Sequence, residues 1–313
     1  MENKDHIKKV AIAICTYKRP KKLREALQSV RGLIIPTDLK ACLIVIDNSP
    51  SEEVKSVFDQ ETNDLSFKAE YVTEFNRGIV YARNRALAEA KRNEADYLAF
   101  FDDDDYPNAS WLESLWLCKK KFDPEVVSGR MLYHWPERVD LDEEIKRLYD
   151  NALGEIETGT ILKKCGSGNV FVDLDFIKKH QLQFHPTFNM TGGEDSHFFE
   201  CLTKLGGKIV WCNEAVINSN VDISRATESF VIGRRYNVGY TRYLSDELIY
   251  GQLLALWKSF YYCIDVWIRC FFDLFRKGSK VTARTKRRLA ESKGRIDSIL
   301  GKKFENYAEI DGE

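Results

Sequence analysis

The sequence lacks three features that would each point to a particular class of protein. The net charge of -1 over 313 residues leaves no overall excess of basic groups, which argues against nucleic-acid binding by the whole surface. The eight cysteines are scattered, with no Cys-x-x-Cys pair and no Cys/His cluster at zinc spacing, so a structural zinc site is not expected. No apolar segment follows Met-Glu-Asn-Lys-Asp at the N-terminus, so we expect no signal peptide and a reduced, cytoplasmic setting.

Composition and the spacing of apolar runs predict the architecture. With 44% hydrophobic and 30% charged residues, the chain can hold one large α/β domain and an appendage, or two domains. Strands are expected at 10–15, 42–46, 67–72, 97–101, 126–133, 170–172 and 208–211, and helices at 21–30, 51–58, 79–92, 110–121 and 195–205. This alternation predicts a doubly wound, mostly parallel α/β sheet with helices on both faces. We expect this domain to cover residues 1–244, and a helical, amphipathic and basic appendage to cover 245–313.

Four consecutive aspartates, Asp102 to Asp105, follow the expected strand at 97–101. Carboxylates gathered at a strand end repel one another and lose hydration unless a positive charge lies among them. Oxygen ligands of this kind suit Mg²⁺ or Mn²⁺, and open α/β sheets bind ligands at the carboxyl ends of their strands. The alternative is a solvated acidic turn in which Asp105 or Asn108 caps the next helix.

Further short motifs favour the first interpretation, because each follows an expected strand or precedes an expected helix. They are Ile14-Cys15-Thr16-Tyr17-Lys18-Arg19, Ile46-Asp47-Asn48-Ser49, Asn76-Arg77-Gly78, Arg83-Asn84, Asp102-Asp103-Asp104, Cys165-Gly166-Ser167-Gly168-Asn169 and Gly192-Gly193-Glu194-Asp195. In this order, over residues 9–240, they resemble the family 2 glycosyltransferases with the GT-A fold. The aspartate strand and the Gly-Gly-Glu-Asp-Ser-His segment are most similar to bacterial exopolysaccharide and lipopolysaccharide sugar transferases.

The resemblance implies a divalent cation, Mn²⁺ or Mg²⁺, held by Asp102 and Asp104, and a register of 103 and 105 stays open. Such a cation neutralises the diphosphate that leaves when the sugar is displaced. The resemblance assigns donor binding to Thr16, Tyr17, Arg19, Asp47, Arg83, Asp103, Gly168 and Asn169. Asp47 would accept a hydrogen bond from a uracil-type base, or else cap the end of its strand. Arg83 would contact the diphosphate bidentately, or else form an i,i+4 surface pair.

The resemblance also makes Asp195 the general base, which removes the proton from the acceptor hydroxyl in a single displacement, with Glu194 supporting the acceptor. Gly192 and Gly193 would let the backbone approach a substrate closely. Alternatively, the two carboxylates are charges at a helix start that the macrodipole favours. His197 is expected to pack beside the helix rather than to bind a metal.

The implied function is inverting, non-processive transfer of one sugar from a nucleotide-diphosphate donor, most often UDP-linked, to a glycan or a lipid-linked saccharide. The Gln-x-x-Arg-Trp motif of processive synthases does not occur, and Arg234-Arg235 in that region is a loose match. A sugar nucleotidyltransferase would carry a glycine-rich phosphate loop, but residues 15–20 contain no glycine. An inactive nucleotide-sugar-binding protein would not need Asp102, Asp104 and Asp195 intact. Nucleic-acid binding through the basic tail is disfavoured, because the tail has few aromatic residues.

Residues 248–275 are dense in large apolar side chains, and the charges among them fall on one helical stripe. Eleven Lys or Arg residues follow between 276 and 303, against two acidic residues. This pattern favours a helix in the interface of an anionic membrane, peripheral on the inner face of the cell membrane, over a membrane span. A helix packed on the catalytic domain, or in a dimer interface, fits the pattern equally well.

Overall fold

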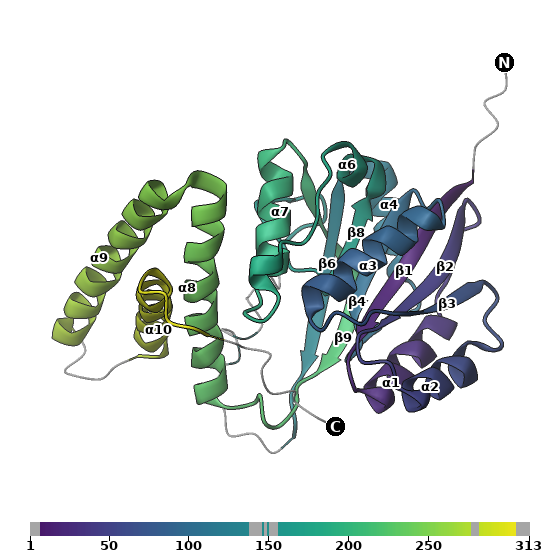
Figure 1. The fold of residues 1–313 in the computed structure, drawn as a ribbon, viewed down its shortest axis with the longest axis horizontal. Coiled ribbons are helices and arrows are strands. Elements are labelled where there is room, and N and C mark those ends of the chain that lie inside the picture. Colours follow the sequence, from purple (N-terminus) through teal and green to yellow (C-terminus); the bar gives the residue numbers. More distant parts are fainter. Residues whose placement is uncertain (1–6, 138–145, 147–148, 150–155, 277–281, 305–313) are drawn as a thin grey trace.

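The computed structural model describes residues 7–137, 146, 149, 156–276 and 282–304 (Figure 1). The predicted surface excursion between residues 135 and 157 lies mostly outside this part of the chain. The strands are β1 Lys8–Thr16, β2 Leu39–Asp47, β3 Lys68–Thr73, β4 Tyr97–Asp102, β5 Asp105–Pro107, β6 Val126–His134, β7 Ile161–Leu162, β8 Asn169–Asp173 and β9 Ile209–Asn220. The helices are α1 Pro20–Arg31, α2 Glu52–Thr62, α3 Ile79–Arg92, α4 Trp111–Phe122, α6 Leu174–Lys179, α7 Glu194–Lys204, α8 Glu228–Tyr250, α9 Gln252–Arg276 and α10 Ala283–Ile299.

The strands form one sheet in the order β3-β2-β1-β4-β8-β6-β9-β5, with β7 paired to β9. The predicted α/β fold is confirmed, and its first half, β3-β2-β1-β4, is parallel throughout. Beyond β4 the sheet is mixed rather than mostly parallel, because β8 runs antiparallel to both β4 and β6, and β9 runs antiparallel to β5. The antiparallel β5 is a three-residue strand that begins at Asp105, so the chain turns back within the aspartate run.

Two hydrophobic cores lie on opposite faces of the sheet. Alternate residues of β1 point to opposite sides, so Ile12 packs in one core and Ala13 in the other. The core around Ile12 contains residues of α1, α2 and α4, and the core around Ala13 contains residues of α3, α6 and α7. These helices cover the two faces, as Figure 1 shows, and leave the ends of the strands as the place for a site.

Helices α8, α9 and α10 form a separate helical unit beside the sheet (Figure 1). The backbones of α8 and α10 touch, because a Cβ atom at Gly239 would lie 1.9 Å from the carbonyl oxygen of Glu291, and one at Gly294 would lie 2.1 Å from that of Tyr236. The predicted domain boundary at 244/245 falls inside α8, and the helical unit begins at Glu228. Of the helices that the structure describes, none combines the length and the hydrophobicity of a membrane span.

Candidate active site

The four aspartates alternate between buried and partly open positions where β4 ends and β5 begins. Asp103 and Asp105 are buried, whereas the side chains of Asp102 and Asp104 are 44% and 20% exposed. Asp102 ends β4, and Asp103 and Asp104 form the turn before β5, which leaves Asp102 and Asp104 on the more open side. This arrangement favours the register of 102 and 104 over that of 103 and 105.

The buried carboxylates of this run are bound by the protein itself. Asp103 accepts a hydrogen bond from the Thr16 hydroxyl at 2.7 Å and one from the Arg19 guanidinium at 3.2 Å. Burial, together with the neighbouring Asp104, raises the pKa of Asp103 to about 6. Burial and its aspartate neighbours also hold the pKa of Asp105 well above its usual range. Burial is the main cause of both shifts, and repulsion by the neighbouring carboxylates adds to it.

Arg83 joins the aspartate run to the glutamate at the start of α7. This α3 residue is buried, donates a short hydrogen bond to Glu194, and donates another to Asp102 at 3.3 Å. The alternative of an i,i+4 surface pair is therefore wrong for Arg83. Burial raises the pKa of Glu194 to about 7 although Arg83 opposes the shift, and burial likewise raises the pKa of Asp102.

The proposed base and the proposed metal ligand flank the glycine-containing loop that precedes β8. A Cβ atom at Gly166 would lie 3.2 Å from Oδ2 of Asp195, and one at Gly168 would lie 3.2 Å from Oδ2 of Asp102. Side chains at these two positions would press on the carboxylates, which explains the glycines. The backbone at 166–168 therefore passes between Asp195 and Asp102, as a tight path to a bound sugar would require.

Helix α7 presents its two acidic residues in different ways. Asp195 is half-buried, whereas Glu194 is buried against Arg83. Gly193, just before them, has a φ of +83°, and a Cβ atom there would lie 2.7 Å from the Cβ of Thr241 on α8. Only glycine meets both demands, so α8 packs directly against the turn that carries the proposed base.

Two of the predicted donor-binding residues are buried and hydrogen-bonded within the protein. Asp47 is fully buried, and its two carboxylate oxygens accept hydrogen bonds from the Tyr71 hydroxyl at 2.6 Å and the Ser49 backbone N–H at 2.9 Å. It caps the end of β2, which is the alternative that its position also allowed. Asn169 is buried as well. It accepts a hydrogen bond from the Trp111 indole and donates two to backbone carbonyls, so both of its amide hydrogens are used within the protein and neither is left for a nucleotide-sugar.

Two residues of the first motif, Thr16 and Tyr17, differ in their burial and contacts. Thr16 is buried, and its hydroxyl donates a hydrogen bond to Asp103. Tyr17 is half-buried, and its ring lies 5.6 Å from the Arg77 guanidinium and 5.5 Å from the Lys18 ammonium. Of the two, Tyr17 is the one that remains available to a nucleotide.

Sequence reasoning missed two residues that organise the site. Arg225, between β9 and α8, lies 3.5 Å from Asp104, and no spacing marked it because only the β5–β9 pairing brings it there. Asn48 donates to the carbonyls of Glu74 and Asn76 and accepts from the Gly78 N–H, so one side chain ties two motifs together. Its place in the Ile46–Ser49 motif was the available signal.

The residues present fit a divalent cation that is completed by its substrate. Among the described residues, no group of three or more His, Cys, Asp or Glu side chains is arranged to hold a metal, so a cation here would have two protein carboxylates. Mg²⁺ is commonly bound by one or two carboxylates together with substrate phosphates. Burial raises the pKa of Asp102 although Arg83 opposes the shift, and the nearby Asp104 and Asp195 raise it further, so a bound cation would relieve the repulsion among these carboxylates.

Two buried polar atoms close to these carboxylates lack a hydrogen-bond partner within the described part of the chain. They are Oε2 of Glu194 and Oγ of Ser167. Buried polar atoms of this kind are normally satisfied, and an unsatisfied one needs an explanation. Since one belongs to the predicted acceptor-binding residue and the other to the loop between Asp102 and Asp195, a bound substrate would supply their partners.

His197 joins helix α7 to the helical unit, as the expectation that it packs beside the helix requires. Its Nδ1 lies 3.0 Å from the Ser245 hydroxyl of α8, and its ring packs against Phe188. Burial lowers the pKa of His197 to about 4. The neutral ring is therefore part of the interface between α7 and α8.

We expect His197 to make the fold sensitive to acid. In the unfolded chain its pKa is about 6.5, so its contribution is fully present above that pH and is lost as the pH falls from about 6.5 to about 4. At pH 4.5 the free energy of unfolding should be about 2 kcal/mol lower on this account. Urea unfolding of the wild type and His197→Gln across this range measures the difference, with His134→Gln, an exposed histidine, as the control. Parallel pH profiles for the wild type and His197→Gln would contradict this expectation.

Comparison with known proteins finds a family match over part of the chain and a relative over most of it. Residues 11–164 match the model of glycosyl transferase family 2. The chain is 27% identical over 310 residues to the succinoglycan biosynthesis protein ExoM of Rhizobium meliloti (strain 1021), covering 95% of each.

Solved structures share the fold at low sequence identity. The mannosyltransferase PcManGT of Pyrobaculum calidifontis, in complex with GDP-Man and Mn²⁺, has a TM-score of 0.62 and 14% identity over 94% of this chain and 88% of its own. S. aureus TarS 1-349, in complex with UDP-GlcNAc, has a TM-score of 0.54 and 15% identity over 97% and 95%. This chain spans 43% of the length of a longer TarS chain. It is therefore a glycosyltransferase that carries a family 2 domain over residues 11–164 on a GT-A fold.

Proposed function

We propose that this enzyme transfers a single sugar, with inversion, from a nucleotide-diphosphate donor to a saccharide acceptor. The observation that carries the proposal is the convergence of Asp102, Asp195 and Glu194 around one glycine-containing loop, with Arg83 buried between them. Inversion needs a base and no covalent intermediate, so one half-buried carboxylate beside the sugar site is sufficient. Family 2 relatives with bound UDP-GlcNAc or GDP-Man share the fold, which supports a nucleotide-sugar donor.

In this mechanism Asp195 accepts the proton of the acceptor hydroxyl as that oxygen attacks the anomeric carbon. Glu194 orients the acceptor through its unsatisfied Oε2, and Arg83 keeps Glu194 and Asp102 at a fixed separation. Arg19 holds Asp103 and Asp104, and Tyr17 covers the nucleotide. Asp102 and Asp104 would hold Mn²⁺ or Mg²⁺, which when bound neutralises the charge of the leaving diphosphate.

The proposal extends to the acceptor and to the place of the enzyme in the cell. A lipid-linked saccharide as acceptor would explain why a helix with a broad apolar surface, α9, follows the catalytic domain. We propose that the protein is cytoplasmic, where its eight free cysteines stay reduced, and that it contacts the inner face of the cell membrane peripherally. We propose a UDP-linked donor, so UDP is the first nucleotide to test.

Thermal unfolding with UDP, GDP, dTDP and CMP, each with and without Mn²⁺, tests the donor site. We expect one nucleoside diphosphate to stabilise the enzyme only when Mn²⁺ is present, by about 2.7 kcal/mol at a hundredfold excess over Kd. The double variant Asp102→Asn with Asp104→Asn should lose this shift, whereas Asp64→Asn on the exposed surface should keep it. No shift with any of the four nucleotides, or an equal shift in the double variant, would reject the proposed metal-dependent site.

A further inference from the structure

Helix α9 packs with its small residues inward and its large residues outward. The stripe that faces α8 and α10 contains Ala255, Ser259, Val266 and Cys270, all buried. The outward residues are between 41% and 85% exposed, and they are Leu253, Leu254, Trp257, Phe260, Tyr261, Ile264, Trp267, Ile268, Phe271 and Phe272. A helix at the surface of a soluble domain normally turns its large apolar side chains to the core. An apolar face of this extent marks a contact with another apolar surface.

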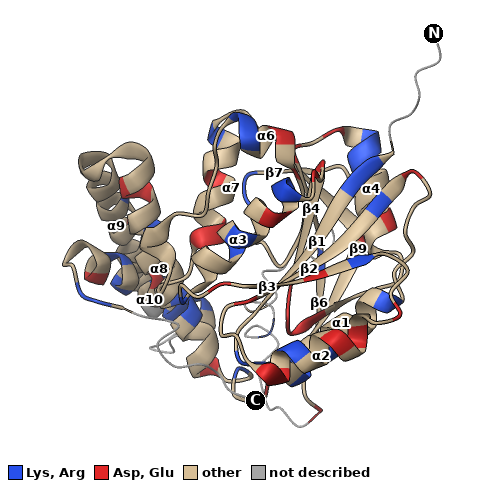
Figure 2. Ribbon diagram, turned by 45° about the vertical axis from the view of Figure 1, so that its right-hand side comes forward, with Lys and Arg blue, Asp and Glu red and all other residues tan. Residues whose placement is uncertain are grey.

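Charged residues border this apolar face along one edge. At 100° per residue the outward residues cover an arc of about 140°, and Lys258, Asp265 and Arg269 follow its margin. Arg269 donates to Asp265 at 2.7 Å, so this pair stays within the margin. In Figure 2 most of α9 is drawn as uncharged residues, and Lys and Arg gather near α8 and α10. This is the pattern of a helix that lies in the plane of a membrane interface.

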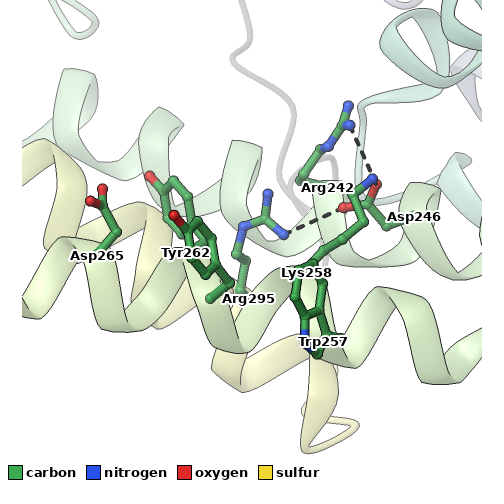
Figure 3. Close-up of a pocket in the computed structure, with 8 residues that line it drawn as sticks. Arg242, Asp246, Trp257, Lys258, Tyr262, Asp265 and Arg295 are labelled. Carbon is green, nitrogen blue, oxygen red and sulfur yellow. Dashed lines mark hydrogen bonds and ion pairs between the residues drawn. The ribbon is translucent and has the colours of Figure 1, made fainter.

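At the same edge, α8, α9 and α10 enclose a pocket of about 270 Å³ (Figure 3). Its centre is the carboxylate of Asp246, which is buried beneath three cations. Lys258 makes a short ion pair with Asp246, while Arg242 lies 3.3 Å and Arg295 3.5 Å from it. Arg242 also pairs with Glu200 at 2.6 Å, and Asp265, which pairs with Arg269, lines the pocket too. The lining therefore contains three cations and two carboxylates, one more positive than negative charge.

The pocket and the apolar face share a wall. Trp257 and Tyr261 line the pocket and belong to the outward face, with their rings stacked 5.9 Å apart at 15°. Tryptophan and tyrosine are enriched at the level of lipid head groups, because each has an apolar body and a polar tip. A surface that covers the apolar face of α9 would therefore also bring its charged groups close to Lys258 and Arg242. The side chains of these two residues are 29% and 30% exposed.

We propose that α9 seats the enzyme on an anionic phospholipid bilayer and that the pocket around Lys258, Arg242 and Arg295 holds a lipid phosphate. This inference deepens the membrane contact proposed above and depends on it. Charge decides between the possible occupants, because a second copy seated on α9 would bring its own cationic pocket against the first. An anionic bilayer supplies the opposite charge to the pocket and to the basic residues of α10.

Co-sedimentation of the full chain with lipid vesicles tests the apolar face. The wild type should bind vesicles with one third phosphatidylglycerol and bind pure phosphatidylcholine vesicles far less. The double variant Trp257→Ser with Phe260→Ser should bind at least about tenfold more weakly, because the inserted apolar area is lost. The control is Leu117→Ser on α4, which removes an exposed apolar side chain outside the helical unit and should leave vesicle binding unchanged. Equal binding by all three proteins would overturn the proposal.

The pocket is tested with two variants that lose the same charge. Lys258→Gln should weaken binding to phosphatidylglycerol vesicles about fivefold, whereas Lys286→Gln on α10, outside the pocket, should weaken it by less than about twofold. Equal losses of vesicle binding in the two variants would reject the pocket as a phosphate site. They would indicate only nonspecific electrostatic attraction between the basic residues and the bilayer. If inorganic phosphate stabilises the wild type but not Lys258→Gln, and vesicles do not bind, the ligand is a free anion. If the wild type is a dimer that does not bind vesicles, and the double variant Trp257→Ser with Phe260→Ser is a monomer, then a second copy of the chain covers the apolar face of α9.

The stabilisation by nucleotide and Mn²⁺ separates this inference from the proposed donor site. Lys258, Trp257 and Phe260 lie in the helical unit, so their variants should keep the full shift. Loss of vesicle binding with the nucleotide shift intact concerns the membrane surface alone. A wild type that binds vesicles but no nucleotide would reject the donor site and keep the membrane surface.

Discussion

Asp195→Asn should lower the rate of sugar transfer about a thousandfold while donor affinity changes less than about twofold. The substitution keeps the size and shape of the half-buried side chain but removes the group that accepts the proton. General base catalysis commonly contributes a factor of about 10² to 10⁴, so the loss should fall in that range. Transfer assays at saturating donor, paired with nucleotide titrations in the presence of Mn²⁺, separate the rate from the affinity.

The control for this experiment is Asp64→Asn, which makes the same chemical change at an exposed position. It should leave both the rate and the affinity unchanged. If Asp195→Asn kept the full rate, the assignment of the base would be rejected, and Glu194 would be the next carboxylate to test. If both quantities fell together, Asp195 would contribute to donor binding rather than to proton transfer.

Arg83→Gln should impair both the stability and the activity of the enzyme. The side chain is buried, and its guanidinium contacts Glu194 and Asp102 at once. Its removal leaves the Glu194 carboxylate buried without its cation, which should lower the free energy of unfolding by about 3 kcal/mol. The rate of transfer should fall about a hundredfold or more, because two carboxylates of the site lose their fixed separation and the diphosphate loses a donor. Urea unfolding and transfer assays measure the two effects.

Two further variants decide whether Arg83 acts only on stability. Arg83→Lys should not restore transfer, because one ammonium group cannot match the planar guanidinium that reaches two carboxylates. The double variant Arg83→Gln with Glu194→Gln removes both charges, so it should recover most of the stability but none of the activity. Recovery of both in the double variant would show that Arg83 has a structural role alone.

The sequence predicted the parts of the site that depend on local pattern. Aspartates at the end of the apolar run 97–101, and glycines at 166, 168 and 193, are readable because a strand end and a close backbone approach demand those residue types. The register of 102 and 104 needed the structure, since four identical residues carry no information about which of them face the open side. The turn between β4 and β5 decided it, because it buries Asp103 and Asp105 and leaves Asp102 and Asp104 more exposed.

Contacts between elements that lie far apart in the sequence could not be predicted from local pattern. Asp47 and Asn169 occupy the expected strand ends, but Tyr71 and Trp111, from other elements, use their hydrogen-bonding groups. Arg225 reaches Asp104 through the pairing of β5 with β9, which joins segments more than a hundred residues apart. No local pattern encodes such contacts, because they follow from strand order.

By itself, the sequence determined the α/β class, the family and the chemical types gathered at the strand ends, because periodicity and motif order are local properties of a chain. The tertiary structure decided which carboxylates face the open side and which cations hold them. It also decided that α9 packs through alanine, serine and cysteine and leaves its aromatic face outward. The composition of α9 allowed either face to be buried, and only the close fit of α8, α9 and α10, whose crossing helices need small residues at their contacts, selected one.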